Sequence, residues 1–227
     1  MVSRPVRDTL LTARGLTYRL AGQAAPVLDG VDLTVNAGEL LDVTGPSGSG
    51  KTTLLRALAR LLPGAQGDLE LEGEPAASVA PREWRARVAL LPQVASMRPG
   101  TVRENLVLPW TLRVRAHESR PDDAALQRAL SGVGLGDVAL DRDAAKLSVG
   151  QAARVSLLRV TLTCPRVLLL DEPDANLDDE SAAQVALLTE RFAADGGGVV
   201  RVRHLRREGT VSRTVRIADG TLEEVGA

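Results

Sequence analysis

The sequence predicts an α/β fold with a mainly parallel sheet core, an antiparallel β portion near the N-terminus and an inserted α-helical subdomain. Two observations indicate the parallel sheet. One is the continuous apolar run 167–170, which is typical of a strand buried on both faces, and the other is a strand, glycine-rich turn and helix over 40–59. Strand patterns then fade between residues 94 and 146. We therefore predict a single domain over 1–227, with 94–146 as the inserted helical subdomain.

Alternating apolar and polar residues predict the N-terminal strands, and helical spacing predicts the middle of the chain. The first half is expected to contain strands at 8–20, 27–35, 40–43 and 68–72, a loop at 73–81, a short apolar run at 88–91, and helical segments at 101–117 and 122–133. The second half is expected to contain a helix ending near 161, strands at 167–170 and 199–202, a helix at 179–194 and a hairpin over 211–225.

Composition and charge narrow the possible partners. The chain has 227 residues, of which 44% are hydrophobic and 25% charged, as in ordinary globular proteins. A formal net charge of -1 gives no support for a nucleic-acid partner, and we expect none. No apolar stretch is long enough to span a bilayer and no signal-peptide pattern is present, so we expect a cytoplasmic chain. The sole cysteine, Cys164, suggests a reducing compartment and a small buried apolar residue.

The chemistry centres on a segment with the pattern G-x-x-x-x-G-K-S/T, at 45–52. Glycines let backbone N–H groups approach a polyphosphate, and the start of the following helix adds unpaired donors. Lys51 is long enough to reach the β- and γ-phosphates, and the Thr52 hydroxyl is a hard oxygen ligand suited to Mg²⁺. The alternative is a Gly/Ser-rich loop that precedes Lys-Thr by chance.

A pair of acids follows the apolar run 167–170. Ligands of parallel sheets bind beyond the carboxyl ends of the strands, which is where Asp171 and Glu172 are expected. Asp171 can hold Mg²⁺ through its water shell, and Glu172 can polarise a water for attack on a γ-phosphate. The alternative is a pair of solvated acids that cap a loop.

Together these segments resemble the ATP-binding-cassette (ABC) ATPases. The resemblance rests on the phosphate loop at 45–52, Gln93 after Leu90-Leu91-Pro92, Leu147-Ser148-Val149-Gly150-Gln151, the run 167–172, Asn176-Leu177-Asp178 and His204. Their order and spacing cover nearly the whole chain. The resemblance implies a P-loop NTPase fold of the ABC type, ATP hydrolysis as the activity, and ATP and Mg²⁺ as cofactors.

The resemblance also implies a role for each position. Tyr18 would stack on adenine. The phosphates would be bound by Gly45, Pro46, Ser47, Gly48, Ser49, Gly50, Lys51, Thr52 and Thr53. The metal would be bound by Thr52, Gln93 and Asp171. In catalysis Glu172 would be the general base and His204 would contact the γ-phosphate, with Lys51 and Gln93 completing the set.

A second group is implied to act across a dimer. Ser148, Gly150 and Gln151 would close on ATP held by another copy, and Asp178 would lie at the same seam. In this family the phosphate loop and the signature stretch 147–151 of one chain do not meet. The resemblance therefore implies a head-to-tail homodimer with ATP in the interface.

Several positions depart from the usual family pattern, although none removes a catalytic group. Val149 replaces the first signature glycine, and Asp42 is an unexpected acid on the strand that leads to the phosphate loop. The other departures are Ala153 in place of Gln, Asp174 in place of Thr or Ser, and Arg203 and Leu205 around His204 in place of Thr and Asp. We expect an active ATPase with slow hydrolysis.

Short single-cassette chains resemble the motor subunits of membrane transporters. The stretch 100–110 is similar to the ATPase subunits of small bacterial iron or metal export systems, which implies that an integral membrane permease docks near 93–115 at the inner face of the membrane. Trp110 and its neighbours could instead simply pack the helical lobe. Two other functions remain open: a non-transport soluble ABC ATPase, and a nucleotide-binding regulatory subunit with weak hydrolysis.

Overall fold

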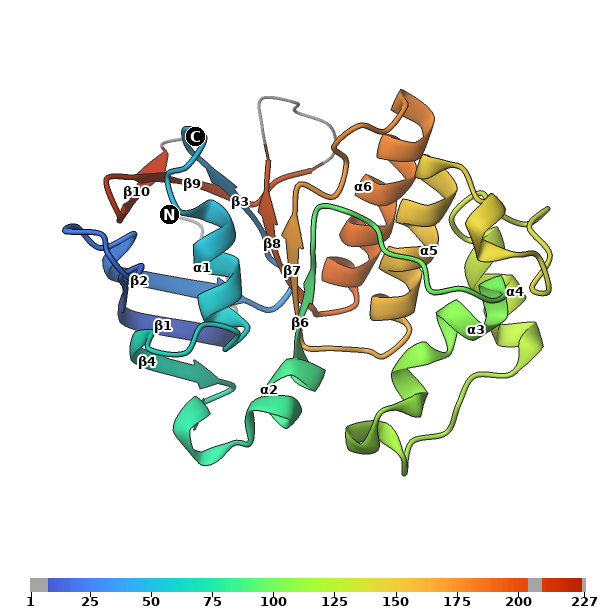
Figure 1. The fold of residues 1–227 in the computed structure, drawn as a ribbon, viewed down its shortest axis with the longest axis horizontal. Helices are drawn as coiled ribbons and strands as arrows, with labels where there is room; N and C mark the ends of the chain where they lie inside the picture. Colours follow the sequence, from blue (N-terminus) through green and yellow to red (C-terminus); the bar gives the residue numbers. More distant parts are fainter. Residues whose placement is uncertain (1–7, 204–209, 226–227) are drawn as a thin grey trace, which may run out of the picture.

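The computed structural model describes residues 8–203 and 210–225 of the chain. Within those residues the strands form a four-stranded sheet of order β2-β1-β4-β5 and a six-stranded sheet of order β10-β9-β3-β8-β7-β6. Figure 1 shows the four-stranded sheet on one side of the molecule, the six-stranded sheet in the middle and helices on the other side. His204 falls outside the described residues, so its predicted role is not placed by the structure.

The four-stranded sheet is antiparallel. It consists of β1 (Thr9–Tyr18), β2 (Leu28–Asn36), β4 (Gln66–Leu71) and β5 (Glu74–Pro75). The central strand β1 pairs with both β2 and β4. The strands expected at 8–20 and 27–35 are thereby confirmed. The strand expected at 68–72 begins two residues earlier than predicted.

The six-stranded sheet is parallel except at one edge. Its strands are β3 (Leu40–Thr44), β6 (Val88–Leu91), β7 (Val167–Asp171), β8 (Gly198–Val202), β9 (Arg213–Ala218) and β10 (Thr221–Val225). The pairs β3·β8, β3·β9, β6·β7 and β7·β8 are parallel, and the terminal hairpin β9·β10 is antiparallel. Because parallel strands end at the same edge, the residues that follow β3, β6, β7 and β8 lie along one edge of the sheet.

Strand β7 separates two hydrophobic cores. All five of its residues are buried, which explains why the run is continuously apolar. Side chains alternate across a strand, so Val167 and Leu169 belong to the core shared with β1, β2 and α1 (Lys51–Leu58). Leu168 and Leu170 belong to the core shared with α5 (Val149–Thr161) and α6 (Asp179–Ala194). Helices therefore cover both faces of this sheet.

The middle of the chain builds a third hydrophobic core. This part of the chain forms the helices α3 (Val102–Leu106) and α4 (Asp123–Ser131) and the 3₁₀ turns η2 (Leu108–Thr111), η3 (Arg113–Arg115) and η4 (Ala144–Lys146). Apolar residues of α3 and α4 pack against Val155 and Leu158 of α5. The segment expected to be helical over 101–117 is broken after Leu106, and Pro109 lies in the first turn of η2. The boundaries 94–146 for a separate subdomain stay a prediction.

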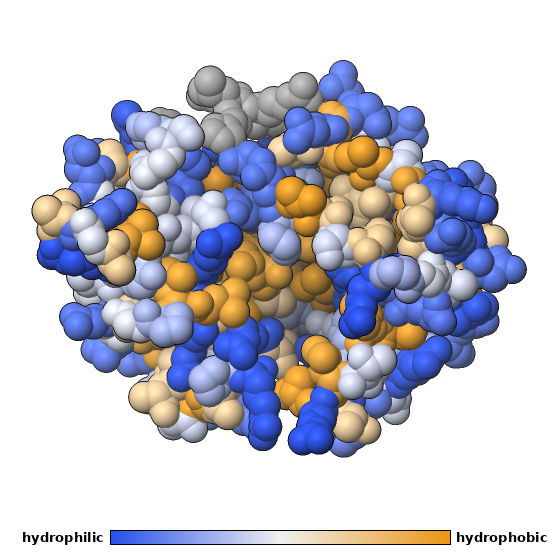
Figure 2. Space-filling view, viewed as in Figure 1, coloured by the Kyte–Doolittle hydropathy of each residue, from blue (hydrophilic) through white to orange (hydrophobic). Residues whose placement is uncertain are grey.

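The helical side and the β-rich side meet at a concave face. Figure 2 shows a hollow near the centre of this face, where hydrophobic residues gather among hydrophilic surroundings. Among the described residues, no helix has both the length and the apolar character required to cross a bilayer.

The structure contains a short helix that the sequence reading did not predict. The expected loop 73–81 contains β5 and η1 (Ala76–Ser78), and α2 (Pro81–Arg87) follows directly. Pro81 at the first helical position and arginines in the last turn are the sequence signals that indicate this helix. Trp84 anchors α2, because it is fully buried and its Nε1 donates a hydrogen bond of 2.9 Å to the Leu58 carbonyl.

The expectation that Cys164 is buried is wrong, because this cysteine is exposed. It follows the end of α5 in a left-handed conformation with φ of 47°, and its N–H donates to the Thr161 carbonyl at 2.9 Å. The chain turns there toward β7, so the side chain points away from the cores.

We predict that Trp84→Ala lowers the free energy of unfolding by about 3–5 kcal/mol, because it leaves a cavity and an unpaired Leu58 carbonyl. Urea denaturation followed by circular dichroism measures this change. Leu187→Ala is the control: Leu187 is 37% exposed on α6, and its loss should cost about 0.5 kcal/mol or less. Equal losses in the two variants would contradict the proposed anchoring of α2.

Candidate functional site

The loop between β3 and α1 is pressed against its neighbours at two glycines. A Cβ added to Gly45 would lie 2.4 Å from the Ile217 carbonyl oxygen, and one added to Gly50 would lie 3.0 Å from the Val27 carbonyl oxygen. Both glycines also have left-handed φ values, 147° and 104°. The loop can therefore follow this path only with glycine at these positions, while residues 46–48 stay exposed to solvent.

Lys51 is the first residue of α1, and its side chain curls back over the loop. The residue is only 7% exposed, and its Nζ donates to the Gly45 carbonyl at 2.9 Å and to the Pro46 carbonyl at 2.8 Å. These partners are neutral, so the positive charge remains available to an anion held at the loop. The N-terminus of α1 adds backbone N–H groups of the same polarity. The arrangement fits a polyphosphate.

Thr52 and Asp171 join the phosphate loop to the end of β7. The Thr52 hydroxyl is within hydrogen-bond distance of both carboxylate oxygens of Asp171, at 3.1 and 2.9 Å. Burial raises the pKa of Asp171, the hydrogen bond from Thr52 opposes this rise, and the charge of Glu172 adds to it. A hydroxyl and a carboxylate are the hard oxygen donors that Mg²⁺ prefers, so these residues fit that ion.

Glu172 is held by the ends of two neighbouring strands. It has a left-handed φ of 49°, and its N–H donates to the Val202 carbonyl at 3.1 Å. Its carboxylate accepts a hydrogen bond of 2.8 Å from Nε2 of Gln93, which follows β6. The structure thus brings Gln93, Thr52, Asp171 and Glu172 to one edge of the sheet.

Tyr18 lies at the end of β1 close to the phosphate loop. Its carbonyl accepts a hydrogen bond of 2.8 Å from the N–H of Val27, the residue that packs against Gly50. The Tyr18 side chain is half-buried and packs against the core beneath the loop. This position suits an aromatic ring beside a nucleotide.

The signature stretch forms a second, separate group. Ser148 caps α5, and Ser148 and Gln151 exchange hydrogen bonds of 3.2 and 3.1 Å in a capping box. Asp178 caps α6 by accepting from the Ser181 N–H at 2.8 Å, and its bonds to Ser181 lower the pKa of Asp178. A Cβ on Gly150 would lie 2.2 Å from the Ser181 hydroxyl, so the two helix starts are in close contact.

Among the residues that the structure describes, the hydrogen bonds of this second group do not reach Lys51, Thr52 or Asp171. Its outermost residue, Val149, is 68% exposed.

Two buried ion pairs explain three of the unusual residues. Arg203 and Asp174 lie 2.8 Å apart, and Arg201 and Asp42 lie 2.7 Å apart. The sequence marked Asp42, Asp174 and Arg203 as unusual, but it did not predict that each acid has an arginine partner. The only signal was that two acids and two arginines stand in or beside strands that are otherwise apolar.

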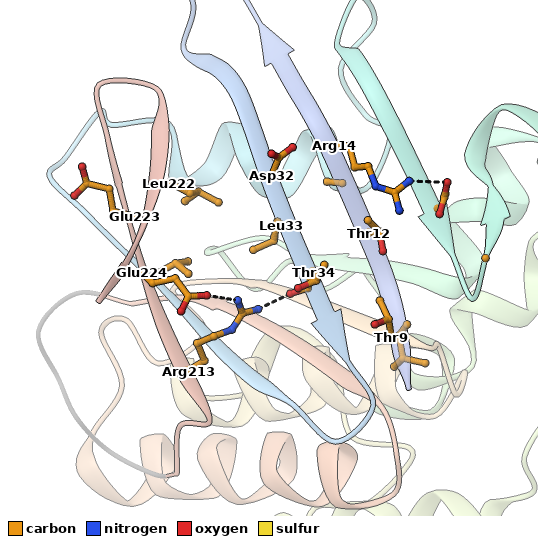
Figure 3. A pocket seen from close by; sticks show the side chains of 15 residues that line it. Thr9, Thr12, Arg14, Asp32, Leu33, Thr34, Arg213, Leu222, Glu223 and Glu224 are labelled. Carbon is orange, nitrogen blue, oxygen red and sulfur yellow. Dashed lines mark hydrogen bonds and ion pairs between the residues drawn. The ribbon is translucent and has the colours of Figure 1, made fainter. Parts of the chain in front are cut away.

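A cavity of about 710 Å³ lies away from these groups, against β1, β2 and the β9–β10 hairpin. Figure 3 shows Arg213 directed toward Glu224, and the pair is 2.8 Å apart; Arg14 pairs with Glu70 at 3.0 Å. None of the predicted site residues lines this cavity. It is therefore separate from the candidate phosphate site.

Comparison with known proteins agrees with this geometry. A sequence model of the family described as "ABC transporter" matches residues 28–175. A hemin import ATP-binding protein, HmuV of Streptomyces coelicolor, is 41% identical over 201 residues, which are 87% of this chain and 70% of that protein. The probable iron export ATP-binding protein FetA of Escherichia coli is 36% identical over 186 residues, covering 82% of this chain and 80% of that protein.

Two solved structures share the fold. A bacterial Atm1-family ABC exporter with ATP bound superimposes with a TM-score of 0.81 at 24% identity, covering 99% of this chain and 40% of that one. A nucleotide-free ATP-binding cassette from an ABC transporter gives a TM-score of 0.77 at 21% identity, covering 94% and 89%. The fold predicted from the sequence is confirmed.

We predict that Asp171→Asn stabilises the nucleotide-free protein at neutral pH. Because burial raises the folded-state pKa of Asp171, the folded chain holds a proton that the unfolded chain releases, and wild-type stability falls as pH rises through that window. The asparagine avoids this loss and can still accept from Thr52.

Urea denaturation between pH 4 and pH 8 should show an advantage of Asp171→Asn that grows with pH and then levels off. Asp178→Asn is the control of opposite sign. The pKa of Asp178 is lowered, so its carboxylate contributes stability above its unfolded pKa, and the variant should be less stable than wild type at neutral pH. If Asp171→Asn instead lowers the free energy of unfolding at pH 7, the claim that burial disfavours the Asp171 carboxylate is contradicted.

Proposed function

Because this chain belongs to the ABC transporter family, whose ATP-binding subunits are ATPases, we propose that it hydrolyses ATP with Mg²⁺ at the β3–α1 loop to power transport through a separate membrane subunit. The observation that carries this proposal is the contact of Thr52 with Asp171. It connects the loop that fits a polyphosphate to the strand end that bears Glu172.

The loop and Lys51 would bind the phosphates of ATP. Glycine at 45 and 50 keeps the backbone close to the ligand, and the ammonium of Lys51 would exchange its carbonyl partners for phosphate oxygens. Thr52 and Asp171, with Gln93 nearby, would hold Mg²⁺, which when bound neutralises charge on the β- and γ-phosphates. Tyr18 would contact the adenine ring.

Glu172 would accept the proton of the attacking water. The acid follows the buried strand β7, and the hydrogen bonds to its backbone and carboxylate restrict where that carboxylate can lie. Gln93 would orient both the water and Glu172. His204 keeps its predicted contact with the γ-phosphate as a proposal, because it lies outside the described residues.

A second copy of the chain would complete the site. Ser148, Gly150 and Gln151 lie at the start of α5, where Ser148 and Val149 are exposed and backbone N–H groups suit a phosphate, and Asp178 lies beside them. Since these residues are not connected to the phosphate loop within the chain, we propose a head-to-tail homodimer that closes on two ATP molecules and opens after hydrolysis.

The partner that moves cargo would be an integral membrane permease docked near 93–115. Val94 is 75% exposed and Leu112 is 55% exposed in this stretch, so apolar contact area is available there. The subunit would then sit peripherally at the inner face of the cell membrane. Co-purification with a membrane protein supports this assignment over a non-transport soluble ABC ATPase, which would be recovered free of membranes.

The cargo proposed from the sequence is iron or another metal, moved outward. The name of the FetA relative, probable iron export, supports that direction, whereas the HmuV relatives are named for hemin import. Metal accumulation in cells that lack this subunit tests the proposal: export predicts more retained metal, and import predicts less.

We predict that Glu172→Gln abolishes nearly all ATP turnover, because the amide cannot accept the proton, while ATP binding persists. Phosphate release and nucleotide titration measure the two properties. Glu83→Gln is the control, since Glu83 is an exposed acid on α2 and the variant should keep wild-type turnover. Unchanged turnover in Glu172→Gln would remove Glu172 from its role and favour a chain that hydrolyses by another route.

We predict that two inactive variants restore activity when mixed as subunits. Lys51→Ala disables the phosphate loop, and Ser148→Arg disables the signature side. In a mixed dimer one of the two sites then has both an intact loop and an intact Ser148. When equal amounts pair at random, half of the dimers are mixed, and each mixed dimer has one working site of two. Turnover should therefore return to about a quarter of wild type. No recovery above the separate variants would contradict a site shared between subunits.

A further inference from the structure

An ion pair fixes the segment that carries Glu172. Nη2 of Arg203 lies 2.8 Å from Oδ2 of Asp174, and the two residues are 6% and 9% exposed. Asp174 lies two residues after Glu172, and Arg203 directly follows β8, the parallel neighbour of β7. The pair therefore connects the ends of the strands that enclose the candidate site.

The ion pair lies beside a backbone hydrogen bond that serves the same two segments. The N–H of Glu172 donates to the Val202 carbonyl at 3.1 Å, one residue before Arg203. The hydrogen bond of Glu172 and the ion pair of Asp174 therefore lie on the two sides of Pro173. Glu172 itself has a left-handed φ of 49°, which is uncommon for a non-glycine residue, and the two links restrain the backbone of residues 172–174.

Stability alone does not account for such a pair. Removing an Arg and an Asp from water is costly, and well-packed apolar replacements of a buried pair often leave a protein equally stable. Positions 174 and 203 carry opposite charges, and their side chains meet although they lie 29 residues apart in the sequence. A gain in the placement of the neighbouring carboxylate explains the pair better.

We propose that the Asp174–Arg203 pair is a positioning device that sets the Glu172 carboxylate for proton transfer. This inference rests on the proposed role of Glu172 as the general base. Arg203 and Asp174 act through the backbone of 172–174, so they are positioning residues. Their loss should lower kcat and leave the affinity for ATP nearly unchanged.

The chain contains a matched control, the Asp42–Arg201 pair. Its atoms are 2.7 Å apart, and its side chains are 11% and 1% exposed, close to the 10% and 6% of Asp174 and Arg203. It joins opposite residues within β3 and β8, and Arg201 also contacts Thr189 and the Thr210 carbonyl. Within residues 8–203 and 210–225, the Asp42 carboxylate accepts from Arg201 and has no hydrogen bond to a predicted site residue.

The first experiment compares Asp174→Asn with Asp42→Asn in the full chain. Each change removes the charge of one buried pair and keeps the shape of the acid, so both should lower the thermal midpoint. Only Asp174→Asn should reduce kcat, by roughly tenfold, with KM for ATP within about twofold of wild type. Turnover is normalised to folded protein by the circular dichroism signal.

The second experiment is a double-mutant cycle with Asp174→Thr, Arg203→Thr and the variant that has both changes. Each single change breaks the ion pair and keeps one of its charges, whereas the double change removes both charges. We expect the double variant to lose about as much kcat as either single variant, roughly tenfold and not roughly a hundredfold, because each single change already breaks the pair.

Equal kcat for Asp174→Asn and Asp42→Asn, a double variant with wild-type kcat, or a double variant whose loss is the product of the two single losses, would overturn the positioning inference. Glu172→Gln separates this failure from that of the proposed function. If that variant retains turnover, the general-base assignment fails. If it is inactive while the cycle shows no coupling, only the role of the Asp174–Arg203 pair fails.

Discussion

The hydrogen bond between the Thr52 hydroxyl and the Asp171 carboxylate is the contact on which the site depends. It crosses from the first turn of α1 to the last residue of β7, and so it sets the distance between the phosphate loop and the acid that precedes Glu172. Burial makes the negative charge of Asp171 unfavourable, and a divalent cation beside the carboxylate would offset that cost. The Asp171 carboxylate, which would bind the metal, is thus disfavoured in its charged form until a cation binds beside it.

The sheet makes this contact possible because β7 has a core on each face. Leu168 and Leu170 pack toward α5 and α6, and Val167 and Leu169 pack toward α1 and the antiparallel sheet. Because both faces of β7 are packed, the positions of Asp171 and Glu172 at its end are restricted. The Asp174–Arg203 pair extends this restraint beyond the end of the strand, where apolar packing no longer acts.

Much of this could be predicted from the sequence, because its signals are local. The turn at 45–50, the buried run 167–170 and the helix 179–194 each have a composition that one conformation satisfies, and the parallel order then brings their ends together. The rest depends on contacts distant in sequence. Helix α2 forms around the buried Trp84, Cys164 is exposed by a turn after α5, and Arg201 meets Asp42 only because β3 and β8 pair.

The most direct test of the central claim is the effect of Mg²⁺ on ATP affinity in Thr52→Val, which keeps the shape of threonine and removes its hydroxyl. Isothermal titration in EDTA should give wild type and variant affinities within about threefold, since the loop and Lys51 are intact. With Mg²⁺ the wild type should bind more tightly, and the variant should lose most of that gain. A variant that gains as much from Mg²⁺ as wild type would contradict the account.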